Sequence, residues 1–374
     1  MIGCFFYPSG ISKTVFRIFC KFAGLRTKAI AFVNRYILHI IILYNEIMWL
    51  DIFWLVLGLV LILYGANLLT DGASAVAKRL GVSDLIIGLT VVALGTSTPE
   101  LVISIMAAVD GNASLAVGNV VGSNIFNILM ILGITALIMP IKIKKSVMSN
   151  EIPMVVLSSL IMVVMGYSAM LDKTSESIIT RTEGIFLLVF FLLFMRYMFA
   201  SARRNKPTET KDPQAADGER LRQMSAFKAI IFIIAGLAGL IWGGDKFVDG
   251  ATGIARLMGV SDAVIGLTIV AIGTSLPELA TSVVAAIKKE NGLAIGNVIG
   301  SNIFNVLLIL GTAATISPLP FGGVTHLDLW VLMGASVLFW ICGWFFDRHV
   351  INRAEGLLML ICYGAYMTYL VIAA

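Results

Sequence analysis

The sequence predicts an all-α polytopic membrane protein with ten transmembrane helices, arranged as two inverted five-helix repeats. Three observations support this fold class: a strongly apolar composition, regularly spaced apolar segments and an internal duplication. Of the 374 residues, 59% are hydrophobic and 13% are charged, whereas about 25% of the residues in a soluble globular protein are charged. The composition therefore places most of the chain in a bilayer and leaves little room for a soluble domain.

Apolar segments long enough to cross a bilayer recur along the chain. A hydrocarbon core about 30 Å thick requires about 20 apolar residues per helix. Ten such segments follow residue 50, near 52–70, 85–109, 115–139, 152–171, 183–200, 226–243, 263–287, 293–316, 327–346 and 355–373. We therefore expect a first five-helix repeat at 48–201, a polar loop at 202–225 and a second five-helix repeat at 226–374.

An internal duplication decides the predicted architecture. Residues 71–133 align with residues 249–311 without a gap, and 38 of the 63 aligned pairs are identical. Each half contains five crossings, so the second copy must enter the membrane from the opposite side. Inverted repeats of this kind are common in secondary transporters and place the substrate site at the interface between the copies.

The distribution of positive charge predicts the orientation, because short cytoplasmic loops are enriched in lysine and arginine. With the 202–225 loop inside, the inner face receives Lys78, Arg79, Lys142, Lys144, Lys145, Arg203, Arg204, Lys288, Lys289, Arg348 and Arg353. The outer connections at 110–114 and 317–326 contain no lysine or arginine, and Lys246 with Arg256 is a mild exception. We expect a prokaryotic inner or plasma membrane, a cytoplasmic central loop and no nucleic-acid partner.

The first 47 residues form an extension that does not fit this plan. They contain six basic residues and no acidic residue before Glu46. One interpretation is an additional basic helix that touches the membrane, and the other is that translation begins at Met48.

Two glutamates indicate the functional site. Glu100 and Glu278 are the only acidic residues inside their apolar segments, and a carboxylate at that depth costs at least a few kcal/mol, which by default marks a functional position. Each belongs to a polar stripe with a spacing of four residues, which falls on one helix face. The four stripes in these and the following segments are Thr96, Glu100, Ser104; Thr274, Glu278, Ser282; Asn119, Ser123, Asn127; and Asn297, Ser301, Asn305.

A proline precedes each glutamate. Pro99 and Pro277 cannot donate to the carbonyl four residues earlier, so we expect each helix to bend or unwind around G-T-S and to expose carbonyls near 93–95 and 271–273. Exposed backbone is tolerated at that depth only when it is buried in protein or lines a cavity. Carboxylate, hydroxyl, amide and carbonyl oxygens suit hard cations such as Ca²⁺ and Na⁺. Two carboxylates also balance one divalent ion.

Other residues give no sign of a different chemistry. The four cysteines lack C-x-x-C spacing and the three histidines are dispersed, so neither a zinc site nor a disulfide framework follows. The serines and threonines lack a neighbouring histidine or lysine that could activate a nucleophile, and we expect neither an enzyme nor a bound cofactor. Asp71 and Asp249 are interpreted as helix caps.

At these motifs the sequence resembles the calcium/cation antiporter superfamily, the sodium/calcium exchanger-like proteins with two α-repeats. The resemblance lies in GTSTPE with GNVVGSNIFN and in GTSLPE with GNVIGSNIFN. It implies a central Ca²⁺ site at Glu100 and Glu278 with main-chain oxygens at Thr96 and Thr274. It further implies flanking Na⁺ sites at Ala93, Ser97, Ser123, Ala271, Ser275 and Ser301. Asn127 and Asn305 match a position that faces the central cluster.

Two departures refine this resemblance. Some relatives carry aspartate at the position of Asn305, and the asparagine argues against potassium co-transport. The central loop of about 24 residues cannot hold the regulatory domains of the animal exchangers, which favours a compact prokaryotic type.

The predicted function is Na⁺/Ca²⁺ antiport across the membrane by alternating access, with both cations and the lipid bilayer as partners. The alternative is a proton-coupled calcium/cation exchanger in which the same carboxylates carry protons. A passive cation channel fits the broken helices less well. The sequence leaves the oligomeric state open, and a monomer is sufficient for this mechanism.

Overall fold

The computed structural model describes residues 48–111, 113–204, 224–259, 271–345 and 349–373. The extension at 1–47 and most of the central loop lie outside the described residues. The first half contains the helix Met48–Leu80, α2 (Asp84–Ile87), η1 (Gly88–Val92), α3 (Ala93–Thr96), α4 (Thr98–Val109), α5 (Ala113–Ile125), η2 (Phe126–Ile131), α6 (Leu132–Ile138), η3 (Val147–Glu151), α7 (Ile152–Gly166), α8 (Ser168–Asp172) and α9 (Arg181–Arg204). The second half contains α11 (Ala226–Leu257), α13 (Ala271–Thr274), α14 (Leu276–Ile287), α15 (Asn291–Phe304), η5 (Asn305–Leu310), α16 (Gly311–Ile316), α17 (His326–Phe345) and α18 (Arg353–Ala373). The η segments are π-helical turns within longer helices.

The fold is a helical membrane protein. Within the described ranges, seven helices are long and apolar enough to cross a membrane, or eight when the bent pair Asp84–Thr96 and Thr98–Val109 counts as one span. Each of the ten predicted segments falls on helix in the described ranges, but the segment near 263–287 is described only from residue 271 onward. The ten-helix count therefore stays a prediction.

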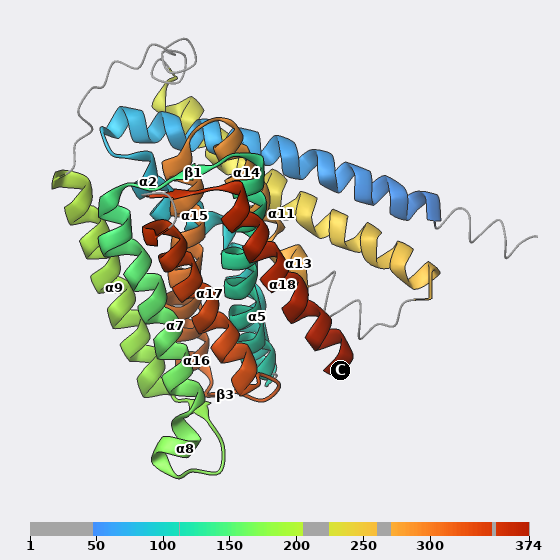
Figure 1. The fold of residues 1–374 in the computed structure, drawn as a ribbon. Helices are drawn as coiled ribbons and strands as arrows, with labels where there is room; N and C mark the ends of the chain where they lie inside the picture. The colour runs from blue at the N-terminus through green and yellow to red at the C-terminus, as the bar shows by residue number, and fades with distance from the viewer. Residues whose placement is uncertain (1–47, 112, 205–223, 260–270, 346–348, 374) are drawn as a thin grey trace, which may run out of the picture.

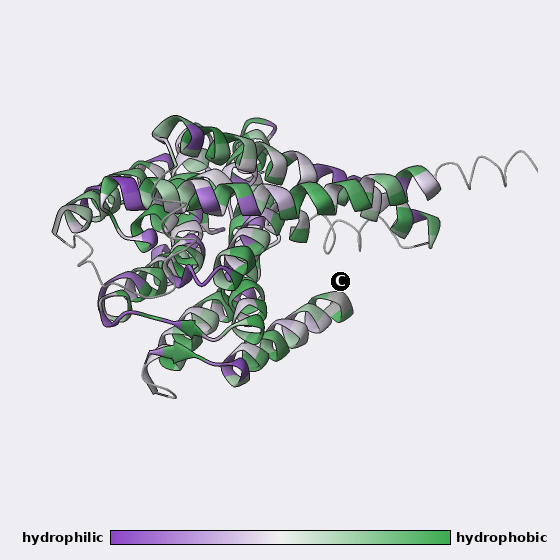
Figure 2. Cartoon of the chain, turned by 90° about the horizontal axis from the view of Figure 1, so that it is seen from above, coloured by the Kyte–Doolittle hydropathy of each residue, from purple (hydrophilic) through white to green (hydrophobic). Residues whose placement is uncertain are grey.

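Two long helices pack on the main bundle and project beyond it (Figure 1). The helix Met48–Leu80 and α11 run side by side and extend beyond the other helices (Figure 1), and the view from above shows the same pair projecting from the bundle with mostly apolar residues along it (Figure 2). Glycines allow the two backbones to touch, because a Cβ atom at Gly65 would lie 2.8 Å from the carbonyl oxygen of Gly236, and one at Gly243 would lie 2.9 Å from that of Gly58. We refer to these two helices as the outer pair.

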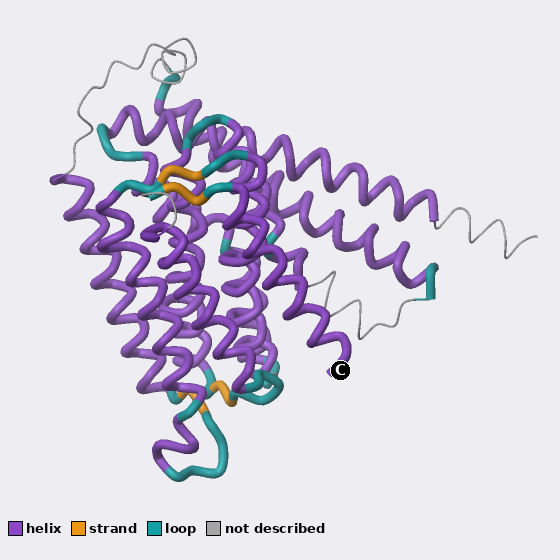
Figure 3. Tube along the Cα trace, viewed as in Figure 1, coloured by secondary structure: helices purple, strands orange, loops and turns teal. Residues whose placement is uncertain are grey.

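Short strand pairs join the two halves at both ends of the bundle. β1 (Ile141–Lys142) pairs antiparallel with β4 (Val350–Ile351), and β2 (Ile178–Ile179) pairs antiparallel with β3 (Leu319–Pro320). Figure 3 shows one pair at the end of the bundle where α9 ends and the other pair at the opposite end. Each pair connects one strand from the first half to one from the second.

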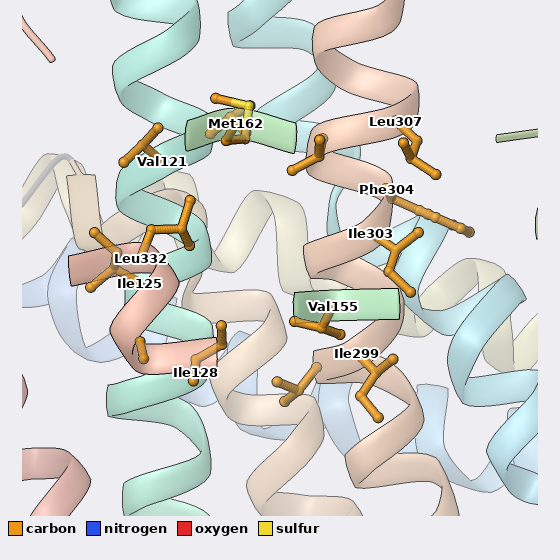
Figure 4. Packing of buried hydrophobic residues seen from close by; sticks show 14 of the residues in the cluster. Val121, Ile125, Ile128, Val155, Met162, Ile299, Ile303, Phe304, Leu307 and Leu332 are labelled. Atoms are coloured by element: carbon orange, nitrogen blue, oxygen red, sulfur yellow. The ribbon is translucent and has the colours of Figure 1, made fainter. Parts of the chain in front are cut away.

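The apolar core lies among α5–η2, α7, α15–η5 and α17. In the span Asn291–Ile316, 94% of the apolar stretch is buried inside the protein, against 22% in α11, which places α15 at the centre and α11 at the periphery. Figure 4 shows the packing, with Ile125 and Ile128 facing the region of Ile299 and Ile303. The rigid centre therefore consists of α5 and α15, the helices that follow the two predicted glutamate motifs.

Capping boxes begin several helices. The Thr180 amide donates to Oε2 of Glu183 at 2.7 Å at the start of α9, and the Thr325 amide donates to Oδ2 of Asp328 at 2.7 Å at the start of α17. In each case the threonine hydroxyl accepts from the amide of the acidic residue at 3.3 Å. These caps satisfy amide groups that a helix start leaves without partners.

Candidate cation site

Each of the two helices that carry a glutamate is interrupted at the serine two residues before its proline. Ser97 leaves helical geometry with a ψ of 9°, and the two parts of the first helix meet at 47°. Ser275 separates α13 from α14 in the same way, with a ψ of 6°. Pro99 and Pro277 occupy the second position of α4 and α14, where a missing amide hydrogen costs nothing. The predicted interruption occurs in both helices at the serine of G-T-S, and a bend is described for the first of them.

The expected exposure of carbonyls does not occur at Ala93 beside the first break. The Ala93 carbonyl still accepts from the Ser97 amide at 3.0 Å and lies 3.4 Å from the Thr96 hydroxyl. Ala93 itself is buried against α15, since a Cβ atom at Gly300 would lie 2.6 Å from its methyl group. Ala271 begins α13, and its side chain is outside the described part of the chain. The first break thus leaves the Ala93 carbonyl at the edge of the site with a partner.

The two glutamates occupy the first turns of α4 and α14 and are both 1% exposed. Helix N-termini carry partial positive charge, which favours a carboxylate at this place. Each glutamate is bonded by the serine of the other repeat: the Ser97 hydroxyl donates to Oε1 of Glu278 at 3.0 Å, and the Ser275 hydroxyl lies 3.2 Å from Oε1 of Glu100. The crossed pairs bring the two carboxyl groups into one buried polar cluster, close enough to interact electrostatically, and we refer to this cluster as the pocket.

Neither carboxyl group is fully satisfied. Oε2 of Glu100 and Oε2 of Glu278 are buried without a hydrogen-bond partner. Leaving a buried oxygen without a hydrogen-bond partner costs about 1–3 kcal/mol, and more when the group is charged. Two such oxygens in one pocket form an arrangement that a bound cation would stabilise.

The threonines of G-T-S lie on the same pocket. Thr96 lies beside Glu278 and Thr274 beside Glu100, which repeats the crossed arrangement of the serines. The Thr96 hydroxyl also donates to Oδ1 of Asn297 at 3.1 Å. Both threonines therefore contact the carboxyl groups through their side chains, and the main-chain oxygens that the resemblance implies at these positions stay a prediction.

The stripes on α5 and α15 divide into two parts. At one end, asparagines hold the helices together: Asn119 Nδ2 donates to the carbonyl of Glu100 at 3.5 Å and to Ser104 at 3.2 Å. Asn297 Nδ2 makes the matching bonds to the carbonyl of Glu278 at 3.3 Å and to Ser282 at 3.1 Å. These bonds fix the glutamate backbones rather than offering free oxygens.

The remaining residues of each stripe follow one and two turns further along α5–η2 and α15–η5. Ser123 is 3.3 Å from the Ser275 hydroxyl, and Ser301 lies beside Glu278. Asn127 and Asn305 are 1% exposed, and the Oδ1 atom of each is buried without a hydrogen-bond partner. Both fall at the start of π-helical segments, η2 and η5, a local geometry that is frequent at functional sites. The structure therefore brings the glutamates, threonines and serines of the predicted set together, while Asn127 and Asn305 lie one turn further along their helices, each with a buried unpaired oxygen.

The donor set is made of oxygen. No group of three or more histidine, cysteine, aspartate or glutamate residues that could hold a metal ion occurs in the described ranges. The pocket offers two carboxylates surrounded by hydroxyl and amide groups, which suits a hard cation better than zinc or copper.

The sequence matches the family described as sodium/calcium exchanger protein over residues 50–200 and 228–372. The chain belongs to this family. It is a multi-pass membrane transport protein and not an enzyme, and the family is the one that the two motifs resemble.

Relatives and solved structures cover nearly all of the helical region. The chain is 38% identical to the putative antiporter CaxA of Alkalimonas amylolytica, over 84% of this chain and 96% of the relative. It is 34% identical to the sodium/calcium exchanger MaX1 of Methanosarcina acetivorans, over 84% of this chain and 97% of the relative. A solved structure of the sodium-calcium exchanger NCX_Mj, soaked with Na⁺ and Sr²⁺, superposes with a TM-score of 0.72 at 31% identity, covering 86% of this chain and 98% of that one.

Two features escaped the sequence. The interpretation of Asp71 as a helix cap is wrong, because the first helix continues to Leu80. Asp71 instead forms an ion pair with Lys288 at 2.8 Å. Asp249 lies inside α11 and pairs with Lys246 at 2.7 Å. The second feature is Asn124, which follows Ser123 and was passed over because it lies outside the four-residue stripe. The duplication repeats Ser123-Asn124 as Ser301-Asn302, and this repetition was the signal that could have identified Asn124.

Proposed function

We propose that this protein is a secondary active antiporter that exchanges Na⁺ for Ca²⁺ by alternating access. The observation that carries the proposal is the crossed pairing of Ser97 with Glu278 and of Ser275 with Glu100, which leaves one oxygen of each carboxyl group buried and unpaired. The family match and the relatives named as antiporters and sodium/calcium exchangers support the substrate class.

Competition for one pocket couples the two fluxes. Ca²⁺ or Na⁺ would bind Glu100 and Glu278, with Thr96, Thr274, Ser97, Ser275, Ser123, Ser301, Asn127, Asn305 and the carbonyls of Ala93 and Ala271 as the surrounding oxygens. An empty pocket exposes two carboxylates to the membrane interior, which is costly. The occluded state is therefore accessible only when cations neutralise the pocket, and net uptake of one cation requires release of the other.

Alternating access follows from two inverted five-helix repeats with the 202–225 loop in the cytoplasm of a prokaryotic cell. The first helix of each repeat, the outer pair, would slide across a fixed site between α4–α5 and α14–α15. The projection of this pair from the bundle supports its role as the moving part.

Vesicle transport with single gradients tests the proposal. Purified protein in sodium-loaded liposomes is expected to take up ⁴⁵Ca²⁺ when external sodium is removed, at equal pH inside and outside and with potassium absent. A potential imposed with an ionophore will change the rate if the exchange is electrogenic. Empty liposomes processed in parallel give the background. Absence of sodium-driven uptake would refute Na⁺/Ca²⁺ exchange.

A proton-coupled exchanger is the second candidate, favoured by the two unpaired carboxyl oxygens, which could carry protons as well as cations. It predicts ⁴⁵Ca²⁺ uptake driven by a pH gradient when sodium is absent from both sides. The same vesicles measure this arm, and uptake under both gradients would show that protons and sodium compete for the pocket.

A further inference from the structure

A buried asparagine outside the predicted site connects the two central helices. Asn124 is one residue from the end of α5 and is fully buried. Its Nδ2 atom donates to the carbonyl of Asn302 in α15 at 3.3 Å, and its Oδ1 atom accepts from Nδ2 of Asn305 at 2.9 Å. Both sides of its amide group are therefore used across the interface between the repeats.

The bond from Asn305 determines which way that side chain faces. In an asparagine amide, the NH₂ group donates and the oxygen accepts, and the two lie in one plane and point in different directions. Because the NH₂ group of Asn305 is directed to Asn124, its Oδ1 atom is directed elsewhere, and that atom is buried without a partner. Asn305 lies one turn beyond Ser301, the stripe residue beside Glu278. Its unpaired oxygen thus lies one turn along the polar stripe from the residue beside Glu278.

The mirror position is built differently. Asn302 is the counterpart of Asn124 in the duplication, but its Nδ2 atom donates to the Val298 carbonyl of its own helix at 2.7 Å. Its Oδ1 atom is buried without a partner and so accepts nothing from Asn127, the counterpart of Asn305. Of these two asparagine pairs, only Asn124 with Asn305 contains an orienting bond.

We propose that Asn124 is a positioning residue for cation binding, which holds the amide of Asn305 so that Oδ1 is presented to the ion as a ligand. The inference rests on the proposed function for the identity of the cation. Residues that orient a metal ligand through one hydrogen bond typically affect metal affinity by about 10–100-fold. The geometry assigns this task to Asn124 and leaves Asn302 as a natural control of the same residue type.

A purely structural role predicts a different result. If Asn124 only joins α5 to α15, its loss weakens the protein or slows transport whatever residue stands at 305. If it orients Asn305, its loss matters only while residue 305 is an amide with two unlike ends. Aspartate at 305 presents two equivalent oxygens, so orientation by Asn124 is no longer needed.

A double-mutant cycle in the full-length protein separates these roles. ⁴⁵Ca²⁺ uptake into liposomes gives KM and the maximal rate for wild type, Asn124→Ala, Asn305→Asp and the double variant, with Asn302→Ala as the matched control. We expect Asn124→Ala to raise the KM for Ca²⁺ about tenfold with little change in maximal rate. The same change in the Asn305→Asp background is expected to leave KM unchanged, and Asn302→Ala to resemble wild type. Equal effects in both backgrounds, or a loss of maximal rate alone, would overturn the inference.

Two further measurements keep the test decisive. Asn124→Asp retains an acceptor oxygen for Asn305 and is expected to preserve the KM, whereas Asn124→Leu retains the volume without the acceptor and replaces the alanine variant if that variant does not insert. Thermal stabilisation of the detergent-solubilised protein by Ca²⁺ reports binding without transport. If wild type does not transport but this stabilisation shows the expected cycle, the proposed function fails and the inference stands.

Discussion

The helix hairpins α4–α5 and α14–α15 have nearly the same residues in the membrane but different residues at their turns. Inside, each glutamate is bonded by the serine of the other repeat, and Asn119 and Asn297 make matching pairs of bonds. At the turn of α14–α15, Lys288 contacts Asp71 at 2.8 Å and Glu290 contacts Lys78 at 3.4 Å, which joins the hairpin to the helix Met48–Leu80. Asp110, the counterpart of Lys288, forms no ion pair among the described residues. The serine–glutamate bonds and the asparagine bonds to the glutamate helices are therefore alike in the two repeats, whereas the turns of the two hairpins differ.

This difference separates two physical tasks. Under the proposed alternating access, a cation entering from either side of the membrane would meet the same ligands, which a twofold arrangement provides. The relative stability of the two access states must instead be adjusted from one end, where ion pairs can hold a moving helix. Four experiments test this division, from the pocket outward.

The largest effect is expected from the glutamates, and it should be equal in the two repeats. Glu100→Gln and Glu278→Gln each remove half of the pocket's charge, so sodium-driven ⁴⁵Ca²⁺ uptake should fall to the level of empty vesicles in both. Glu151→Gln is the matched control, because Glu151 is another buried glutamate that lies outside the pocket. Its Oε1 atom accepts a hydrogen bond from the Tyr197 hydroxyl at 3.2 Å. Normal uptake in either pocket variant would contradict the shared site.

The crossed serines should show the first inequality. A hydrogen bond to a charged group contributes about 1.5–3 kcal/mol, so Ser97→Ala and Ser275→Ala should each raise the KM for Ca²⁺ about tenfold or more. Ser275→Ala should have the larger effect, because its hydroxyl also contacts Ser123 at 3.3 Å. Uptake kinetics give the comparison, and Ser275→Thr, which keeps the hydroxyl, is the control. A larger effect at Ser97 would reverse the order that the contacts imply.

The stripe asparagines should differ in stability. Asn119→Ala and Asn297→Ala each lose two hydrogen bonds to a glutamate helix. Asn297→Ala also removes the acceptor of the Thr96 hydroxyl, so we expect it to lower the free energy of unfolding by about 1 kcal/mol more. Thermal unfolding in one detergent measures the difference. Identical unfolding midpoints would show that the Thr96 bond contributes nothing.

The smallest effect is expected at the turn. Lys288→Ala removes a partly exposed ion pair and a bond to the Asn67 carbonyl at 3.2 Å, which together contribute about 1 kcal/mol or less. Transport should continue, with a modest change in rate that disappears at high salt because salt screens the pair. Lys145→Ala, at an exposed lysine on the same predicted face, is the control. A salt-independent loss of transport would contradict this assignment and indicate that Lys288 takes a direct part in cation transport.

The sequence predicted the glutamates, their stripes and the helix breaks because the bilayer restricts the alternatives. Apolar length predicts a crossing, a proline removes one specific hydrogen bond, and a duplicated motif with an acid points to one shared site. The partners within the site could not be predicted in this way. A spacing of four residues does not reveal that Ser97 serves Glu278 rather than Glu100, since that depends on how the two breaks face each other.

Helix length was the other gap. The segment 52–70 was taken from its apolar run, but the helix continues to Leu80 because Ala73 and Ala77 on its inner side remain buried. Asp71 and Lys78 therefore point to neighbours from within a helix. The orientation of the Asn305 amide could not be predicted either, because a sequence pattern does not distinguish the nitrogen from the oxygen of one side chain.

The glycines of the outer pair have a consequence for leakage. Gly65 with Gly236, and Gly58 with Gly243, bring the two backbones into direct contact, so neither helix can shift alone without breaking that contact. If the pair is the moving part, its displacement is a single coordinate, and uncovering the pocket toward one compartment covers it toward the other. Side chains larger than hydrogen at these places would loosen the joint, and the two entrances could then open together and dissipate the gradient.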